Sequence, residues 1–487
     1  MSTRQTSVGG VLGKRGALAT AALLAISLAA TATACGDDGA DASDHDATTS
    51  AASGGSTSAQ DGTDAADTGT ASGSGPSSDS DGTDGSGTDA TGSDGAMADL
   101  GLARGITVIG IGVNQGLEVD PAARYSVTAL RARDTMLRVY FDVDEVSWQE
   151  VSPNGRQLEA RLFLRVDGIE QAYLEQSKLV RQDSEEATLN LVFSFEVPAA
   201  VVEDGLEYRV ELHEADLAYA GLPSAEVDPV FPPTGWTRLD VPADAVANRL
   251  RVVMVPLEYE GNCEPTATFD DAYFEQIRFT VHNMLPVSEL EFSVREPIPW
   301  TTPVTGDSTF DLLLPAVADV RAQDQPDPDV YYMGLIDICA DCEDCPAGSG
   351  YYAEPTLAAA PFRASIVVHR DDLARVANSA VHELGHNHNL QHNPCSDFVE
   401  NPGEVLPDYP HANGLIGVDG YEFATDSLHD DASTYDVMAS CRPRWTSNLS
   451  WTRVRAHIQQ LQSAVLAQGP APEREQLFVS PGVVVCR

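Results

Sequence analysis

The sequence predicts an α+β fold class, with an all-β sandwich domain followed by a domain in which strands alternate with helices. From about Leu100 to Pro242, short runs with partial apolar alternation, such as "LEARLFLRVDG" and "ATLNLVFSFEV", are separated by turn sequences such as Pro153-Asn154-Gly155. Short strands at this spacing are typical of a β-sandwich. After about Asn248, apolar runs such as "LRVVMVPLEY" alternate with segments of helical spacing. This second pattern predicts a twisted, partly parallel sheet covered by helices.

The second domain is expected to continue as alternating strands and helices. Helical spacing appears in "DDAYFEQIRFTVHNMLP" and "FDLLLPAVADVRAQD", and strands are expected at "ELEFSVRE", "DVYYMGLIDIC" and "RASIVVHR". A further helix should begin near Asp371 and Asp372 and run through "VHELGHNHNL", and a last one should start in "NLSWTRVRAHI".

The charge of the chain narrows its class of partner. Its 487 residues contain 74 Asp and Glu against 29 Lys and Arg, a net charge of -45. Nucleic-acid binding needs clustered basic residues that displace counterions, and none stand out here, so we expect no nucleic-acid partner. Such acidity favours solubility outside the cell and suits divalent cations, although no ordered calcium-loop motif supports Ca²⁺.

The N-terminus has the pattern of an export signal. Arg4, Lys14 and Arg15 precede a short apolar run that ends at "ATAC", Ala32 to Cys35. The run is too short and too rich in alanine for a transmembrane helix. "ATAC" resembles a bacterial lipobox, which implies that Cys35 is lipidated; an ordinary signal peptide ending near a cysteine is the alternative. We expect an exported chain, either a surface-exposed envelope lipoprotein held only by this anchor or a secreted protein.

The residues after Cys35 lack the composition of a folded domain. Up to about Met97 they are almost all Asp, Gly, Ser, Thr and Ala, with no Lys or Arg. Such a segment cannot bury enough apolar surface to offset its ordering entropy, and it reads as an extended tether. The expected units are a lipoprotein signal peptide at 1–35, a disordered tether at 36–99, the β-sandwich at 100–245, the second domain at 246–470 and a tail at 471–487.

The segment "VHELGHNHNLQHNPC", Val381 to Cys395, has the spacing of a metal site. His382 and His386 lie four residues apart, which puts both imidazoles on one face of a helix. Glu383 follows the first of them, where it can take a proton from a metal-bound water. His392 lies six residues beyond His386, at the spacing of a third ligand after the helix has turned, and Met438 lies downstream in "YDVMASC".

These residues resemble the metzincin zinc endopeptidases, whose signature is H-E-x-x-H-x-x-G-x-x-H followed by a Met-turn. The sequence around this motif is similar to that of a bacterial secreted group related to the mucin-degrading zinc metalloproteases. It includes "HELGHN", "HNPC", "PDYPHANGLIGVDGY" and "YDVMASCRPRW". The resemblance covers roughly Leu250 to Gln468 and is densest from Val381 to Trp451, and it implies a metzincin-like catalytic domain at 246–470.

The resemblance implies a role for each matching residue. His382, His386 and His392 would bind one catalytic Zn²⁺, and Glu383 would be the general base that assists attack of a zinc-bound water on a peptide bond. Met438 would form the floor under the metal, and Cys395 would pair with Cys441. "RASIVVHR" would be the edge strand along which an extended polypeptide or glycoprotein substrate lies. The implied protein is a monomeric metalloendopeptidase; a catalytically weak or inactive surface lipoprotein that acts as a binding module is the alternative.

Two positions depart from the family pattern. Asn389 replaces the glycine at the turn after the helix, where a positive φ is usual and where Asn is the next most tolerant residue. Ser440 stands where related sequences often carry a tyrosine that helps to stabilise the oxyanion. His388 lies about 200° around the helix from His386 and should face away from the metal.

The cysteine count leaves two arrangements open. Besides Cys35, Cys395 and Cys441, the chain has Cys263 and Cys486 and a C-x-x-C-x-x-C motif at Cys339, Cys342 and Cys345. Three thiols at this spacing suit either disulfides in an oxidising compartment or a second metal site, and Cys263 and Cys486 are candidate partners for them.

Overall fold

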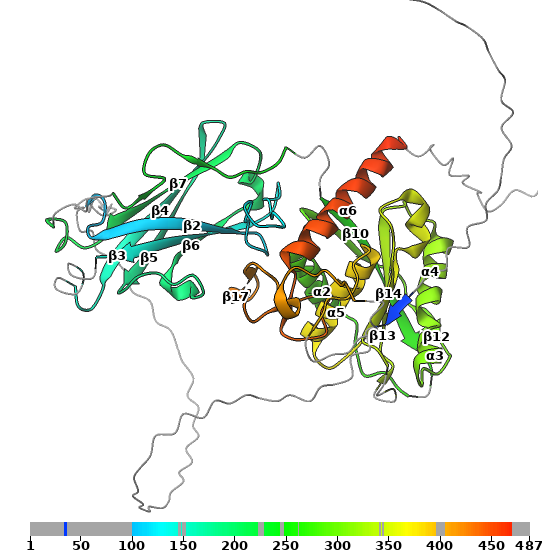
Figure 1. The fold of residues 1–487 in the computed structure, drawn as a ribbon. Coiled ribbons are helices and arrows are strands. Elements are labelled where there is room, and N and C mark those ends of the chain that lie inside the picture. Colours follow the sequence, from blue (N-terminus) through cyan, green and yellow to red (C-terminus); the bar gives the residue numbers. More distant parts are fainter. Residues whose placement is uncertain are drawn as a thin grey trace, which may run out of the picture.

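A computed structural model describes residues 34–36, 100–144, 148, 152–222, 228–243, 248–261, 263–339, 342, 345–395 and 405–469. The expected signal peptide, tether and C-terminal tail lie outside these ranges, apart from the backbone of 34–36. The described chain belongs to the α+β class: two antiparallel sheets at its N-terminal side and one mixed, helix-covered sheet at its C-terminal side (Figure 1).

The N-terminal part is a β-sandwich. One sheet has the order β2-β3-β6, with strands at Ile106–Asn114, Thr135–Val143 and Phe193–Val197. The other sheet has the order β5-β4-β7-β8, with β9 also on β7, and its strands lie at Ile169–Val180, Arg156–Val166, Leu206–Glu214, Val230–Phe231 and Thr237–Arg238. Inward residues of both sheets, such as Leu162 and Phe193, share one buried apolar core. The alternation seen in the sequence therefore corresponds to one buried and one outer face of each sheet.

The second part is built on a sheet with the order β1-β14-β15-β13-β10-β11, with β12 also paired to β10. Its strands are β1 (Ala34–Gly36), β10 (Arg249–Tyr259), β11 (Glu289–Val294), β12 (Ile298–Trp300), β13 (Val330–Ile336), β14 (Gly348–Tyr351) and β15 (Ala364–Val368). Strands β10 to β13 and β15 are parallel, whereas β14 and β1 are antiparallel to their neighbours. Every residue of β13 and β15 is buried, as expected for strands covered on both faces.

Helices cover both faces of this sheet. They are α2 (Asp271–Met284), α3 (Asp307–Phe310), α4 (Leu313–Asp324), α5 (Leu373–Asn387) and α6 (Asn448–Ala467). Residues of α2, α5 and α6 share a core with Leu250, Val252 and Met254 of β10, while α4 packs on the other face against Val255 and Leu257 (Figure 1). Alternate residues of β10 thus serve two different cores.

Shorter elements complete the fold around the motif. The strand pairs are β16 (Gly420–Glu422) with β17 (Ser427–His429), and β18 (Tyr435–Asp436) with β19 (Arg444–Trp445). Short 3₁₀ turns lie at Leu189–Leu191, Ala199–Val201, Leu357–Phe362 and Ala412–Gly414.

The edge of the mixed sheet differs from the expectation. β15 lies between β13 and β14, so "RASIVVHR" is an interior strand and β14 is the next strand outward. The short segment Ala34–Gly36 pairs with β14, and Cys35 is opposite Gly350 in this register. The error arises because "GSGY" of β14 has two glycines and no apolar alternation, so the sequence shows no strand signal there.

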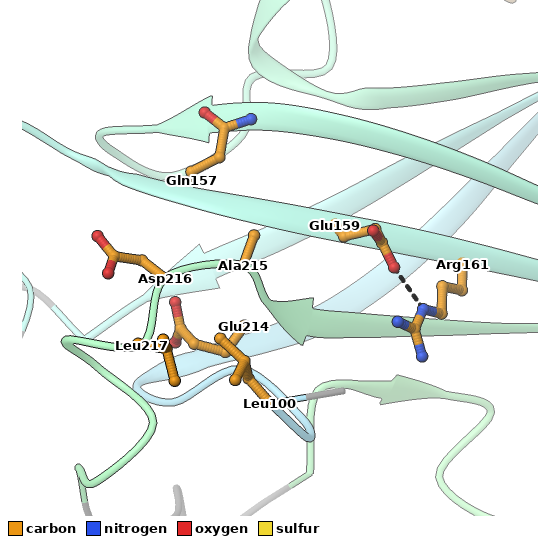
Figure 2. A pocket seen from close by; sticks show the side chains of 8 residues that line it. All are labelled: Leu100, Gln157, Glu159, Arg161, Glu214, Ala215, Asp216 and Leu217. Atoms are coloured by element: carbon orange, nitrogen blue, oxygen red, sulfur yellow. Dashed lines mark hydrogen bonds and ion pairs between the residues drawn. The ribbon is translucent and has the colours of Figure 1, made fainter. Parts of the chain in front are cut away.

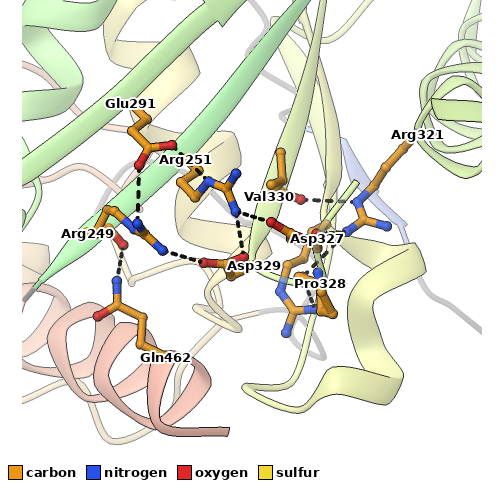
Figure 3. A network of polar contacts seen from close by, with 10 residues as sticks. Arg249, Arg251, Glu291, Arg321, Asp327, Pro328, Asp329, Val330 and Gln462 are labelled. Carbon is orange, nitrogen blue, oxygen red and sulfur yellow. Dashed lines mark hydrogen bonds and ion pairs between the residues drawn. The ribbon is translucent and has the colours of Figure 1, made fainter. Parts of the chain in front are cut away.

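A polar network closes the N-terminal ends of the parallel strands (Figure 3). Arg251 of β10 binds Glu291 of β11 at 2.9 Å and Asp329 before β13 at 3.1 Å. Gln462 of α6 donates to the carbonyl of Arg249 at 2.5 Å, which joins the last helix to the central strand.

The sandwich is attached to the second domain through buried polar contacts. Arg133 donates to the carbonyls of Leu285 and Val287, just after α2, at 2.8 and 2.5 Å. Trp445 Nε1 donates to the carbonyl of Gly116 at 2.6 Å. An unpaired buried guanidinium or indole N–H would be costly, so these contacts fix the relative position of the two domains.

Three disulfides link described residues, at Cys263–Cys339, Cys342–Cys345 and Cys395–Cys441. The three cysteines of the C-x-x-C-x-x-C motif are therefore all in disulfides. This pairing is compatible with an extracellular protein. Within the ranges that the structure describes, no helix is both long and apolar enough to cross a bilayer.

Candidate metal site

The helix α5 carries two of the histidines on its buried side. It begins where the Asp372 side chain accepts hydrogen bonds from the N–H groups of Ala374 and Arg375, a typical N-cap. His382 and His386 lie one turn apart near its C-terminal end, and both are almost fully buried. The helix therefore holds both imidazoles in a dry environment.

The three predicted histidines meet at one point. Nε2 of His392 lies 3.2 Å from Nε2 of His382 and 3.2 Å from Nε2 of His386. Zn–N bonds of about 2.0–2.1 Å in tetrahedral geometry put two ligand nitrogens about 3.3 Å apart. The described residues contain this buried triad as a group that could hold a metal ion.

Backbone carbonyls fix the orientation of two of the rings. Nδ1 of His382 lies 2.8 Å from the carbonyl of Val437, and Nδ1 of His386 lies 2.9 Å from the carbonyl of Leu390. A carbonyl can only accept, so Nδ1 carries the proton and Nε2 keeps its lone pair. Such outer partners are those that orient metal-binding histidines.

The turn after α5 supplies one of those carbonyls. Asn389 has φ 64°, so the left-handed conformation expected at this position is confirmed. Its N–H donates to the carbonyl of His386 at 2.8 Å, and the N–H of Leu390 donates to the carbonyl of Gly385 at 3.0 Å. This pair of bonds is a Schellman motif. The same turn that ends the helix also presents the carbonyl of Leu390 to His386.

The segment that carries His392 is tied to the Met-turn. The side-chain amide of Asn393 donates to Asp436 Oδ1 at 2.7 Å, and that oxygen also accepts from the N–H of Met438 at 2.7 Å. The other oxygen of Asp436 accepts from the N–H of Ser447 at 2.9 Å. Cys395 and Cys441 form a disulfide across the same two segments. Asp436 therefore braces the turn and contacts no ligand histidine through these bonds.

Met438 packs beneath the ligand helix. It is fully buried, and a Cβ at Gly385 would collide with its sulfur atom. Gly385 lies between the two ligand histidines of α5, so the absence of a side chain there lets the Met-turn approach the helix backbone.

Glu383 follows His382 in α5, and its side chain packs against β14. The side chain is fully buried. A Cβ at Gly348 would lie 2.5 Å from its Oε1, and a Cβ at Gly350 would lie 2.8 Å from its backbone oxygen. The two glycines thus create the space that the carboxylate occupies. Neither glycine was predicted, because a glycine pair indicates close backbone approach only once the segment is known to be a strand.

The other histidines of this region do not join the triad. His388 is buried against Tyr331 and His457, with its Nδ1 2.6 Å from the carbonyl of Leu384, and burial lowers its pKa to about 4. His411 contacts Asn448 at 2.7 Å, and His429 stacks on Trp445.

Tyr352 is a further residue near the triad that was not predicted from the sequence. Its ring packs edge-on against His386, with centroids 5.1 Å apart. Ser440, where the family pattern has a tyrosine, is partly buried after the Met-turn. A tyrosine ring is therefore present beside a ligand ring, but it comes from the segment after β14.

Comparisons with known proteins give no family. Neither a family model nor a curated protein matches the chain. A solved structure titled "Structure of a chaperone-substrate complex" is similar over 54% of this chain, at 13% identity and a TM-score of 0.21. The match spans 40% of that other chain, which is less than half of its length. A likeness this weak gives no basis for inference about fold or function.

A cavity of about 510 Å³ lies away from the triad, in the sandwich (Figure 2). Its lining is polar on one side, with Gln157, Glu159 and Asp216, and apolar at Leu100 and Leu217. Glu159 is already paired with Arg161 at 2.5 Å. None of the three histidines lines this cavity, so it is separate from the candidate metal site.

Proposed function

We propose that this protein is a zinc-dependent endopeptidase that hydrolyses peptide bonds of extracellular proteins or glycoproteins. The observation that carries the proposal is the meeting of three histidine Nε2 atoms, with the buried Glu383 next to His382 in the same helix. Its motif and Met-turn resemble those of the metzincins, and the proposal extends that resemblance to the activity of this chain.

The donor set suits zinc. Three neutral imidazoles are nitrogen ligands of intermediate softness, and three protein ligands are the usual number at a catalytic zinc site, which keeps one position open. His382, His386 and His392 would hold the ion. When bound, it supplies a Lewis acid that polarises a carbonyl and lowers the pKa of water to about 7.

The remaining chemistry falls to Glu383. Its carboxylate, held between α5 and the glycines of β14, would take the proton from the attacking water and pass it to the leaving amine. The packing of Gly348 and Gly350 restricts the positions that the carboxylate can adopt. A fixed base loses little entropy on reaching the geometry of proton transfer.

The edge of β14 is the surface on which we place the substrate. Residues 34–36 of the chain pair with it as an antiparallel strand, which supports its capacity to accept extended polypeptide. Main-chain pairing of this kind gives affinity without demanding particular side chains. We further propose that the chain is exported and lipidated at Cys35.

The test uses purified protein with measured metal content and a casein or glycoprotein digest. Wild type should carry one zinc and cleave, Glu383→Gln should keep zinc and lose at least 10²-fold in rate, and His392→Ala should lose zinc. His411→Ala, outside the triad, is the matched control and should retain both. If the wild type holds zinc but cleaves no faster than Glu383→Gln, the alternative of a catalytically inactive binding module would replace the proposal of an enzyme. Zinc lost from His388→Ala but kept in His392→Ala would overturn the ligand assignment.

A further inference from the structure

Three carboxylates meet where the sandwich touches the second domain. Glu118 follows β2, Glu186 lies shortly before β6, and Asp419 precedes β16; one oxygen from each lies within 4.8 Å of the others. The N–H of Glu118 donates to the carbonyl of Asp419 at 2.8 Å, so the two domains are hydrogen-bonded at this point. In Figure 1 the hairpin that contains β17 faces the sandwich. The cluster therefore lies on the domain junction.

Only part of this negative charge is balanced by the neighbouring guanidinium. Arg138 is fully buried, with Nη2 3.8 Å from Glu118 Oε1 and 4.0 Å from Asp419 Oδ2. These distances are longer than direct hydrogen bonds. Three carboxylates and one guanidinium leave two negative charges. Burial, and to a smaller extent the neighbouring carboxylates, raises the pKa of Glu118 to about 7, and burial also raises the pKa of Asp419.

A buried side-chain amide lies next to Asp419, one member of this cluster. Asn114, at the end of β2, is fully buried, and within the described part of the chain its Oδ1 has no hydrogen-bond partner. Its Nδ2 donates to the carbonyl of Asp419 at 3.3 Å. Asn114 forms an antiparallel bridge with Glu118, and bridged residues place their side chains on the same face. A buried acceptor without a donor, in a residue that contacts Asp419 and is bridged to Glu118, has the character of a cation ligand.

We propose that Glu118, Glu186, Asp419 and Asn114 Oδ1 form a calcium site that fastens the sandwich domain to the second domain. All the ligand atoms are oxygens, and Ca²⁺ accepts six to eight oxygens in flexible geometry, with water completing the shell. Mg²⁺ requires near-ideal octahedral positions, which ligands from three separate segments would satisfy poorly. A divalent ion cancels the two remaining negative charges. This site shares no residue with the histidine triad.

Thermal unfolding of the full chain tests the site. Calcium is removed on a chelating resin, zinc is held at a constant buffered level, and Ca²⁺ is then added to 10 mM. We expect Tm to rise and saturate, with a smaller response to Mg²⁺. Asp419→Asn and Glu118→Gln should leave the calcium-free Tm equal or higher, because they remove repulsion, and should abolish the response to calcium. Asp204→Asn, at an exposed ion pair with Arg238, is the control and should respond like wild type.

Terbium luminescence provides a second readout that does not depend on stability. Tyr140 stacks near Arg138, 5.5 Å from its guanidinium carbon, and can sensitise Tb³⁺ bound in the cluster. The signal should be displaced by Ca²⁺, lost in Asp419→Asn, weakened in Tyr140→Phe and unchanged in His382→Ala, which removes only the triad. No Tm response in wild type, or a full response in Asp419→Asn, would overturn the calcium site and leave the zinc proposal untouched.

Discussion

The side-chain amide of Asn393 donates to Asp436 Oδ1 at 2.7 Å, while the backbone N–H of Asn393 donates to the carbonyl of Met438 at 2.9 Å. Asn393 follows His392 directly in the sequence. This pair of contacts joins the segment of the third histidine to the Met-turn, 43 residues later in the chain. The position of His392 therefore depends on residues that are not metal ligands.

Replacing Asp436 should loosen the triad from a distance. Asp436→Ala leaves three donors without their carboxylate, from Asn393, Met438 and Ser447, and a buried unsatisfied group costs about 1–3 kcal/mol. We expect unfolding free energy to fall by about 3 kcal/mol or more and zinc affinity to fall about 10–100-fold. Chemical unfolding and competition with a zinc chelator measure the two effects. Asp311→Asn, at an exposed position, is the control. Unchanged zinc affinity in Asp436→Ala would show that the brace does not act on the metal site.

The glycines of β14 should affect the base and leave the metal in place. Gly348→Ala puts a Cβ within 2.5 Å of Glu383 Oε1, so the carboxylate must move. We expect kcat to fall at least tenfold while zinc content stays at one per chain. Gly306→Ala, whose Cβ meets nothing within 4 Å, should leave both unchanged. Gly385→Ala should have the opposite effect. Its Cβ displaces Met438 beneath the ligands, so zinc affinity should fall more than the catalytic rate of the zinc-loaded protein.

Sequence patterns predicted the local parts of this site well. The start of α5 at Asp372, the shared face of His382 and His386, and the left-handed turn at Asn389 all follow from local rules for capping, helical period and backbone conformation. The edge strand was predicted wrongly, and the two glycines were not predicted, because the "GSGY" sequence of β14 has low strand propensity. Its glycines fit the close contact with Glu383.

Long-range polar partners could not be predicted from the sequence. Arg133 in the sandwich binds carbonyls about 150 residues later, and Asp436 binds an amide from the ligand segment. A single Arg or Asp in a loop has the same local appearance whether it is solvated or buried. Only the fold brings such partners together, which is why the domain junction and its carboxylate cluster were absent from the sequence-based prediction.

The turn residue Asn389 should tolerate glycine but no branched side chain. Its φ of 64° costs a residue with a Cβ roughly 1–2 kcal/mol, which Asn reduces and glycine avoids. Asn389→Gly should therefore keep the unfolding free energy nearly unchanged and the zinc affinity within a factor of about three. Asn389→Val should lose about 1–2 kcal/mol of unfolding free energy. It should also bind zinc more weakly, because the carbonyl of Leu390 orients His386. Unfolding and zinc titration of both variants check this. A zinc affinity of Asn389→Val equal to that of the wild type would show that the turn does not influence the metal site.

Acid should destabilise the folded protein through histidines that desolvation keeps neutral, and the half-buried His282 is a clear example. Desolvation, followed by the charges of Arg133 and Arg278, lowers its pKa from 6.5 to about 3. His282 is therefore protonated in the unfolded chain at pH values where it is neutral in the folded chain. Its contribution to the unfolding free energy is complete above about pH 6.5 and is lost as pH falls toward 3, at about 1.4 kcal/mol per pH unit. Glu118 has the opposite effect: its folded-state pKa is raised to about 7, so its contribution to the unfolding free energy becomes more favourable as pH falls.

The comparison of two variants isolates this histidine. His282→Gln and its parent should both carry His382→Ala, so that metal release at low pH does not contribute. Between pH 6 and 4, unfolding free energy of the glutamine variant should fall by about 2 kcal/mol less than that of the parent. Parallel pH profiles would mean that His282 takes up its proton in the folded state.

Tyr352 should support catalysis in place of the tyrosine missing at Ser440. Its ring lies edge-on to His386, 5.1 Å between centroids, directly after the strand that we propose receives the substrate. Loss of one oxyanion donor typically costs about 10²–10³ in kcat. We expect Tyr352→Phe to lower kcat by at least tenfold with KM and zinc content nearly unchanged, and Ser440→Tyr to restore part of the rate in that background. Tyr409→Phe, whose hydroxyl binds the carbonyl of Leu415 at 2.7 Å, is the matched control. Full activity in Tyr352→Phe would reduce this residue to a packing role, because phenylalanine preserves the ring and removes only the hydroxyl.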